Sequence, residues 1–317
     1  MQVLVTGATG FVGRALVPML QKSGHDVAVA VRNITSLAHL GNIRVHNVGD
    51  IGPKTGWQEA LTGIDAVIHL AGRAHVIAET DEDPLAAYRH INRDGTRQLT
   101  KAAADAGVKR IVYLSSVKVN GERTTEQPFD EIMTPEPENA YGVSKLEGEQ
   151  ALLDIATKTS LETVIVRTPL VYGPYVKGNF LSLLNICMKN LPLPLGGLKN
   201  RRNLIYVNNL ADALIQCLSH ANATGGLYLV SDGDSISTTT LINKTAKALE
   251  KTSLLFSLPN FMLKTIGLLT GKKTTVCRLI ESLEVSDTAI RRDLGWTPPF
   301  TMVQGLAETA AWFKSSK

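Results

Sequence analysis

A tyrosine and a lysine stand four residues apart in the stretch Tyr141-Gly142-Val143-Ser144-Lys145. On a helix, this spacing places both side chains on one face. A free phenol titrates near pH ~10, and a neighbouring ammonium group favours the phenolate and lowers that pKa. The pair can then act as general acid and base near neutral pH. The same pattern also fits a surface Tyr–Lys pair at the start of a helix.

Two hydroxyl groups, Ser115 and Ser116, directly follow the apolar run 110–114. A hydroxyl at the carboxyl end of a strand, close to a helix that carries Tyr141 and Lys145, can orient a carbonyl or an alcohol. Serine at such a position also serves simply to cap a loop. The chemistry therefore depends on whether the fold brings the strand end and the helix together.

A glycine-rich turn near the start of the chain supplies a second kind of chemistry. It reads Thr6-Gly7-Ala8-Thr9-Gly10-Phe11-Val12-Gly13, between the apolar run 3–5 and the helix-periodic run 15–20. Glycines allow a sharp strand-to-helix turn and a close approach of backbone. The helix N-terminus then directs free N–H groups and a positive dipole end at one point, which suits a pyrophosphate. A tight turn without a ligand is the alternative.

Strand-like and helix-like runs alternate through the first half of the chain. We expect strands at 3–5, 27–31, 43–48, 66–70, 110–114 and 162–166, and helices from 84 to about 104 and from 141 to about 157. Near-continuous apolar strands that alternate with helices predict a doubly wound parallel α/β sheet covered on both faces. In such a sheet, ligands bind beyond the carboxyl ends of the strands.

The pattern changes after Arg167, where loops rich in proline and glycine appear. We expect strands at 205–207 and 227–230 that return to the sheet or extend it, and helices at 209–220, 239–250 and 303–314. The predicted organisation is a Rossmann-type dinucleotide-binding domain over 1–168, joined by returning segments at about 203–232. Residues 169–202 and 233–317 would form a smaller, discontinuous substrate lobe.

Composition excludes several other classes of protein. The chain has 317 residues, is 44% hydrophobic and carries a formal net charge of +4. Its positive residues are scattered, which argues against nucleic-acid binding, and its three cysteines show no disulfide or metal spacing. The apolar stretch 254–269 contains Pro259 and Lys264, is short for a membrane span and is interpreted as a core or interface helix. Loose contact with a membrane is the alternative for this stretch. Met1 leads directly into a strand with no signal peptide, so we expect a cytoplasmic protein.

Together these motifs resemble the extended short-chain dehydrogenases/reductases, the NAD-dependent epimerase/dehydratase family. The resemblance covers nearly the whole chain. Besides the glycine turn, Ser115-Ser116 and Tyr141…Lys145, it includes His69-Leu70-Ala71-Gly72, Asn92 with Gly95-Thr96, 167–174, 202–207 and Leu294-Gly295-Trp296.

The resemblance implies a role for each matching residue. Tyr141 would transfer the proton, Lys145 would hold the cofactor ribose and tune Tyr141, and Ser116 would bind the reacting oxygen. The other cofactor contacts would come from Gly7, Thr9, Gly10, Phe11, Val12, Gly13, Arg32, Asp50, Ile51, Leu70, Ala71, Gly72, Asn92, Ser115 and Pro169. The substrate would also meet Lys118, Asn179, Leu195, Arg202 and Arg278, with Asn179 and the two arginines on its diphosphate. No metal is implied.

Two departures from the family pattern narrow the activity. NAD-preferring dinucleotide folds carry an acid after the second strand, whereas this chain has Val31 and then Arg32, so that NADPH is accepted and Asp50 still serves the adenine side. The sugar 4,6-dehydratases carry Asp-Glu after the catalytic hydroxyl, where this chain has Val117-Lys118. Dehydration is therefore not expected.

The stretch 115–122 most resembles a subgroup from bacterial surface polysaccharide (O-antigen) synthesis that includes the UDP-N-acetylquinovosamine dehydrogenases. The leading hypothesis is an NAD(P)(H)-dependent reductase acting on the C4 ketone of a UDP-4-keto-6-deoxy-N-acetylhexosamine. The alternative is a UDP-glucose or UDP-GlcNAc 4-epimerase with tightly bound NAD. A non-catalytic dinucleotide sensor is the remaining hypothesis. Such a protein should have lost Tyr141 or Lys145, and both are present.

The family often pairs two helices per subunit into a four-helix dimer interface. The segments from Pro84 and Tyr141 carry Ala- and Leu-rich faces, formed by Leu85, Ala86, Leu99, Ala102, Ala103, Leu146, Ala151 and Leu152. We therefore expect a homodimer. The alternative is that these faces only cover the sheet.

Overall fold

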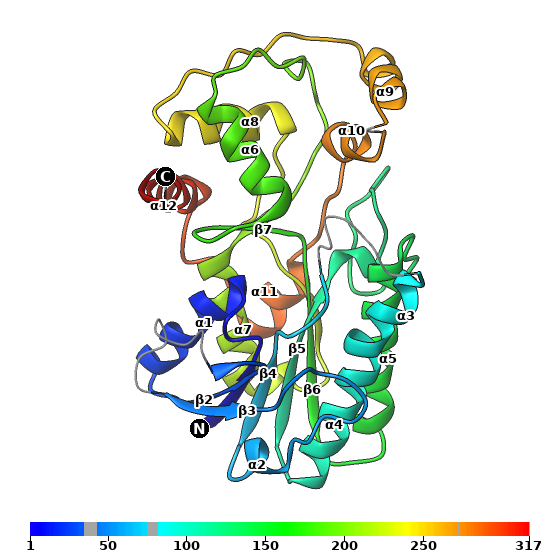
Figure 1. Cartoon of the computed structure of the whole chain (residues 1–317), viewed down its shortest axis with the longest axis vertical. Helices are drawn as coiled ribbons and strands as arrows, with labels where there is room; N and C mark the ends of the chain where they lie inside the picture. Colours follow the sequence, from blue (N-terminus) through cyan, green and yellow to red (C-terminus); the bar gives the residue numbers. More distant parts are fainter. Residues whose placement is uncertain (35–42, 75–81, 272, 317) are drawn as a thin grey trace.

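The computed structural model describes residues 1–34, 43–74, 82–271 and 273–316. Within these residues, seven strands form one parallel sheet in the order β3-β2-β1-β4-β5-β6-β9 (Figure 1). The strands are β1 Gln2–Thr6, β2 Asp26–Val31, β3 Arg44–Asn47, β4 Ala66–His69, β5 Arg110–Ser116, β6 Glu162–Thr168 and β9 Leu227–Leu229. The strand order reverses between β1 and β4, which opens a crevice at the carboxyl edge of the sheet. The predicted doubly wound fold is confirmed.

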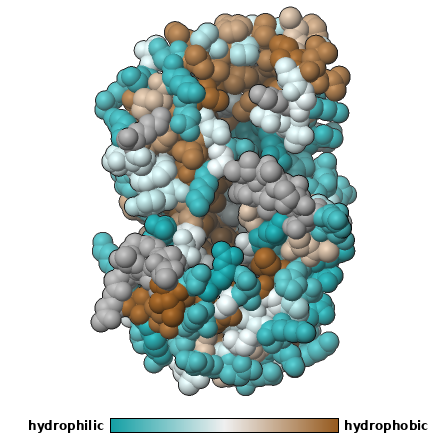
Figure 2. All heavy atoms as spheres, in the orientation of Figure 1, coloured by the Kyte–Doolittle hydropathy of each residue, from teal (hydrophilic) through white to brown (hydrophobic). Residues whose placement is uncertain are grey.

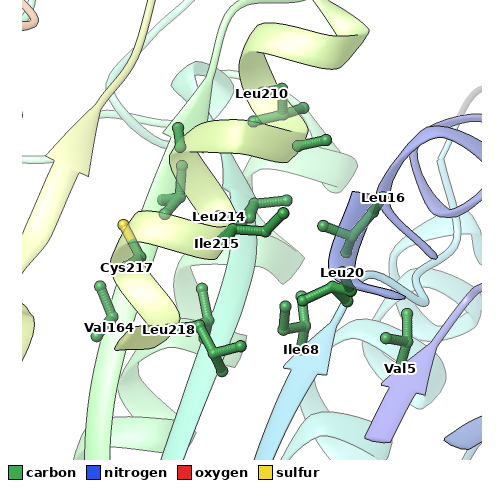
Figure 3. Packing of buried hydrophobic residues seen from close by; sticks show 14 of the residues in the cluster. Val5, Leu16, Leu20, Ile68, Val164, Leu210, Leu214, Ile215, Cys217 and Leu218 are labelled. Atoms are coloured by element: carbon green, nitrogen blue, oxygen red, sulfur yellow. The ribbon is translucent and has the colours of Figure 1, made fainter. Parts of the chain in front are cut away.

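Helices cover both faces of this sheet. Helices α1 Phe11–Lys22, α7 Val207–Ser219 and α11 Thr288–Leu294 cover one face, and α2 Gln58–Leu61, α3 Pro84–Arg89, α4 Thr96–Asp105 and α5 Ala140–Ala156 lie on the other. Because side chains alternate along a strand, Val5 packs on the first face and Leu4 on the second. Figure 3 shows Val5 and Ile68 meeting Leu20 of α1, with Leu214 of α7 beside them.

The helix expected from 84 to about 104 is interrupted. A π-helical turn, His90–Gly95, separates α3 from α4. The wider turn points Asn92 inward, where its amide bonds the backbone of Arg73 and the hydroxyl of Ser144. Gly95 packs so tightly that an added Cβ would lie 2.6 Å from a methyl group of Ile51. Tertiary contacts thus replace the regular helical pattern here.

The second half of the chain adds a small two-stranded sheet and a separate apolar cluster. Strands β7 Leu170–Tyr172 and β8 Leu204–Tyr206 pair with each other, so the strand expected at 205–207 does not join the main sheet, whereas β9 does. Helices α6 Gly178–Met188, α8 Thr238–Ala248 and α12 Met302–Ser315 pack around Phe180, Leu241 and Leu306. We propose the two-lobe division on the basis of this cluster.

Helices α9 Asn260–Leu269 and α10 Lys273–Ile280 lie at the far end of that lobe (Figure 1). Of the two interpretations of 254–269, the core helix is wrong, because the helix begins only at Asn260, after Pro259, and buries just Leu263 and Gly267. The interface helix stays a prediction. The expected helix therefore leaves most of its apolar side chains exposed. No helix in the described part of the chain is long and apolar enough to cross a membrane.

The faces expected to form a dimer are largely used inside the subunit. Leu99, Ala103 and Leu152 pack against the sheet in the same cluster as Leu4, and Ala151 is also buried. These four residues cover the sheet, as the alternative held. Leu85, Ala86 and Leu146 keep partial or full exposure, and the homodimer stays a prediction.

Candidate functional site

The glycine turn links β1 to α1 at the crevice. Gly7 has φ +71°, which favours glycine, and a Cβ there would lie 2.8 Å from the backbone nitrogen of Ala71. A Cβ on Gly13 would lie 2.4 Å from the carbonyl oxygen of Gly7. Gly10 caps α1 without any side-chain bond to the helix N-terminus and is itself exposed. The first turn of α1 is therefore open to an anionic ligand.

A buried histidine fastens this turn to β4. The Nδ1 atom of His69 lies 2.7 Å from the Thr6 hydroxyl, and its Nε2 atom lies 3.1 Å from the Thr96 hydroxyl. Burial, and then the charge of Lys145, lowers the pKa of His69 to about 3. His69 therefore stays neutral, and its ring orders the ends of β1 and β4 beside each other.

The fold places Ser116 beside Tyr141, and Lys145 follows Tyr141 one turn along the same helix. Ser116 ends β5, and Tyr141 lies in the first turn of α5, which Asn139 caps through a 2.8 Å bond from the Gly142 nitrogen. Gly142 lets this turn pass over the end of β5, since a Cβ there would lie 2.4 Å from the Lys118 carbonyl oxygen. The Ser116 side chain is close enough to affect the titration of Tyr141.

The lysine of this group does not act on the tyrosine as the sequence suggested. Its Nζ atom donates a 2.8 Å hydrogen bond to the Leu114 carbonyl and lies 3.9 Å from the centre of the Tyr113 ring. Burial lowers the pKa of Lys145 to about 7. Desolvation raises the pKa of Tyr141 to about 12, although Ser116 opposes the rise. The expected lowering of the tyrosine pKa is not found in the ligand-free protein, because desolvation of the phenol outweighs the effect of Ser116.

Beneath this group lies a buried ion pair that the sequence analysis did not identify. Arg167 of β6 binds both carboxylate oxygens of Glu149 on α5, with Nη2–Oε2 at 2.6 Å and Nε–Oε1 at 3.0 Å. Each side chain is only 3% exposed. The Ser115 hydroxyl donates to the same carboxylate, and Arg167 also donates to Asn120 at 3.2 Å. The Ser115 hydroxyl is therefore occupied within the protein rather than free for a cofactor.

A cluster of cations stands on the substrate side of the crevice. Arg202 donates to the carbonyl oxygens of Arg278 at 2.7 Å and of Glu281 at 3.0 Å. Desolvation first, and the positive charge of Arg278 second, lower the pKa of Arg202. The pKa of Lys118 is likewise lowered, by desolvation above all and also by the two arginines, while Glu122 at 2.5 Å opposes this. Three cations that destabilise one another's charge suit an anionic group such as a diphosphate.

Comparisons with known proteins agree with this geometry. Residues 3–231 match the NAD dependent epimerase/dehydratase family. The chain belongs to this family. It is 40% identical over 314 residues to the UDP-glucose 4-epimerase of Vibrio cholerae, covering 98% of this chain and 95% of that one. It is 27% identical over 325 residues to the N-acetyl-alpha-D-glucosaminyl-diphospho-ditrans,octacis-undecaprenol 4-epimerase of Escherichia coli O157:H7, covering 97% and 93%. The solved structure of MoeE5 in complex with UDP-glucuronic acid and NAD superposes with a TM-score of 0.81, at 25% identity and full coverage of both chains.

As a member of the NAD dependent epimerase/dehydratase family, the chain is an enzyme that uses NAD, and its residues fit this cofactor. The exposed, uncapped start of α1 at Gly10 can receive the pyrophosphate, and the loop Leu70–Gly72 lies against it. Tyr141 and Lys145 stand beside the same crevice and would face the ribose and nicotinamide. Bound NAD supplies the acceptor and donor of hydride.

Of the other residues expected to contact the cofactor, some are buried within the protein and others are partly exposed at the start of α1. Asn92 is buried, and its amide bonds Arg73 and Ser144, so it positions the loop after β4 rather than offering a free side chain. Pro169 is buried between β6 and β7. Thr9, Phe11 and Val12 line the start of α1 with partial exposure.

Arg32 and Asp50, which were predicted to contact the cofactor, form an exposed ion pair. Arg32 Nη1 lies 3.4 Å from Asp50 Oδ1, with the side chains 77% and 83% exposed. Val31 before it is buried, and Ile51 after Asp50 packs against Gly95. Exposed ion pairs contribute little to stability, so Arg32 could leave Asp50 and approach a ribose phosphate at little cost.

Two other predicted substrate residues belong to the second half of the chain. Asn179 is exposed in the first turn of α6. Leu195 is half-buried in a loop that pairs with Ser257, and its carbonyl accepts a 2.6 Å bond from Thr239. Their contact with a substrate stays a proposal.

The sequence analysis placed His69 and Arg167 in matching motifs without giving them a role, and it did not identify Glu149. A charged residue near the end of an otherwise apolar strand, as Arg167 is in β6, was the available signal. Among the described residues, no group of three or more His, Cys, Asp or Glu side chains could hold a metal ion.

Proposed function

We propose that this chain is a UDP-hexose 4-epimerase acting on UDP-glucose or UDP-GlcNAc with bound NAD. Both curated relatives described above are named 4-epimerases, and one of them is 40% identical over nearly the full length of both chains. This identity favours the epimerase over the 4-keto reductase that the sequence alone put first. The juxtaposition of Ser116 and Tyr141 at the end of β5 is the observation that carries the chemistry.

Tyr141 is the group that exchanges a proton with the sugar O4. In the ligand-free protein its pKa is raised to about 12, so it holds its proton and is ready to donate to a C4 ketone. Removing the proton from a C4 hydroxyl requires the phenolate, so bound substrate and cofactor must lower this pKa. The Ser116 hydroxyl would hold the same oxygen and keep it in line with Tyr141.

Inversion at C4 also requires the sugar to present each of its faces in turn to one hydride site. The nucleotide must stay anchored while the hexose turns. Lys118, Arg202 and Arg278 supply such an anchor, because they gather positive charge at one place on the substrate side. Few groups would hold the hexose ring itself, so that it can turn. Ser116 and Tyr141 would contact the sugar O4 in both orientations of the ring.

The first experiment is incubation of the purified chain with UDP-glucose and, separately, UDP-GlcNAc, with no cofactor added. The epimerase hypothesis predicts interconversion with UDP-galactose or UDP-GalNAc, and release of NAD from the denatured protein. Tyr141→Phe should abolish interconversion while leaving bound NAD. No interconversion in either direction, with NAD present in the protein, would refute the proposal.

The 4-keto reductase is the second candidate, and the Val31-Arg32 pair favours it. A reductase must exchange its cofactor each turnover, and a site without an acid there tolerates NADPH. A UDP-4-keto-6-deoxy-N-acetylhexosamine incubated with NADPH would then be reduced stoichiometrically. The two candidates are separated by whether net reduced cofactor is consumed.

A further inference from the structure

Helix α9 presents an apolar surface to solvent. Within it only Leu263 and Gly267 are buried, whereas Phe261 is 70%, Leu268 66% and Leu269 81% exposed. The loop that leads to the helix adds Leu254 and Phe256, which are 47% and 49% exposed. Figure 2 shows apolar atoms gathered along the upper end of the molecule, where Figure 1 places α9. We call these five exposed side chains the α9 surface.

The sequence around the α9 surface carries positive charge without any acid. Between Glu250 and Glu281 there is no Asp or Glu, while Lys251, Lys264, Lys272, Lys273 and Arg278 all fall in this stretch. An apolar helix in a basic segment has the composition of an interfacial helix, which inserts its apolar side chains and places its lysines among headgroups.

A cavity beside α9 gathers several of these charges. It measures about 400 Å³ and is lined by Lys264 and Leu268 of α9 and by Lys273 of α10, with Arg123 on its other side. Its one acid, Glu281, lies 3.8 Å from Arg123. An opening with three cations and an apolar wall fits a phosphate headgroup whose acyl chains lie along the helix.

We propose that the α9 surface docks this enzyme on an anionic lipid bilayer. A second copy of the chain fits less well, because a symmetric contact would bring two basic segments together and repel. An anionic leaflet attracts the same charges, by about 1 kcal/mol for each Lys or Arg near the surface. One short helix gives reversible binding. The inference is independent of the sugar reaction proposed above.

The consequence for the site follows from α10. Arg278 lies on α10, and its carbonyl accepts the bond from Arg202. The docking surface therefore adjoins the cation cluster, and docking would bring the substrate side of the crevice close to the headgroups.

The test is flotation of the full chain with two kinds of vesicle. One contains phosphatidylcholine alone, and the other contains about 30% phosphatidylglycerol as the anionic lipid. We expect binding to the anionic vesicles at low salt, and at least about tenfold weaker binding to neutral vesicles. Phe261→Ser/Leu268→Ser/Leu269→Ser should lose binding to both, and Lys264→Glu/Lys273→Glu should lose the preference for anionic lipid.

Matched controls come from exposed residues elsewhere. Ile132→Ser replaces a side chain that is 92% exposed, and Lys158→Glu reverses an exposed charge outside the segment. Both should bind like the parent chain, and all variants should keep its thermal midpoint, since the replaced side chains face solvent.

Two results would overturn the proposal. One is equal recovery of the parent chain and the triple serine variant with anionic vesicles. The other is absence of vesicle binding together with a parent chain whose self-association, measured by sedimentation velocity, disappears in the triple variant; the α9 surface would then join two copies.

Discussion

The Arg167–Glu149 pair is predicted to carry a large share of the stability of the fold. Arg167→Met removes two hydrogen bonds to the Glu149 carboxylate, at 2.6 and 3.0 Å, and leaves that carboxylate buried with the Ser115 hydroxyl as its hydrogen-bond partner among the described residues. Breaking a buried ion pair by removing one partner costs about 3–5 kcal/mol. Folded proteins are stable by only about 5–15 kcal/mol, so the loss should be plain in the free energy of unfolding.

The double variant distinguishes the ion pair from simple loss of packing. Replacing both residues by methionine removes the uncompensated charge, and well-packed apolar replacements of buried pairs are often neutral. We therefore expect Glu149→Met/Arg167→Met to be less destabilised than the sum of its two single variants, by more than about 1 kcal/mol of coupling. Both side chains are 3% exposed, so solvent screening should reduce this coupling energy only slightly.

Urea unfolding of the ligand-free protein measures these energies, provided that circular dichroism and fluorescence report the same transition. The matched control is the exposed pair Arg32–Asp50, at 3.4 Å and 77% and 83% exposure. Arg32→Met should change the unfolding free energy by no more than about 0.5 kcal/mol. A cost below about 1 kcal/mol for Arg167→Met, or strict additivity of the double variant, would refute the reasoning.

Four further predictions concern the site. Tyr141→Phe should lower turnover by ~10²–10⁴-fold without weakening NAD binding measured by calorimetry, because only the transferable proton is lost; retained turnover would mean another acid. Gly13→Ala places a Cβ 2.4 Å from backbone and should cost about 1–3 kcal/mol and abolish NAD binding, whereas Gly56→Ala, whose nearest neighbour is a side-chain atom at 3.5 Å, should do neither in the same assays. Because burial lowers the pKa of Lys145 from its ordinary value of 10.5 to about 7 in the folded protein, the unfolded chain binds more protons between these limits, and stability should rise with pH there by up to about 1.4 kcal/mol per unit more than in Lys145→Met. Arg32→Ala should raise the KM for NADPH more than that for NADH, and equal effects would mean that Arg32 faces solvent or stacks on adenine.

The sequence by itself determined the frame of the molecule. Apolar runs of strand length alternate with segments of helical periodicity, and this pattern predicted the parallel sheet. A strand that is covered by helices on both faces must be apolar at nearly every position. The turn from Gly7 to Gly13 could be placed because its glycines are required by local backbone geometry. The shared helix face of Tyr141 and Lys145 could likewise be predicted, because their four-residue spacing places both side chains on one side of a helix whatever packs against it.

Only the tertiary structure decided what these groups contact. Glu149 binds Arg167, and Lys118 lies close enough to Arg202 and Arg278 for their charges to lower its pKa, because the fold brings these distant segments together. Lys145 binds the end of β5, and burial sets its pKa and that of Tyr141, an effect that no spacing in the sequence can predict. The exposure of α9 was left open between a core and an interface helix for the same reason, because an apolar segment has the same composition in a core and on a surface until its neighbours are known.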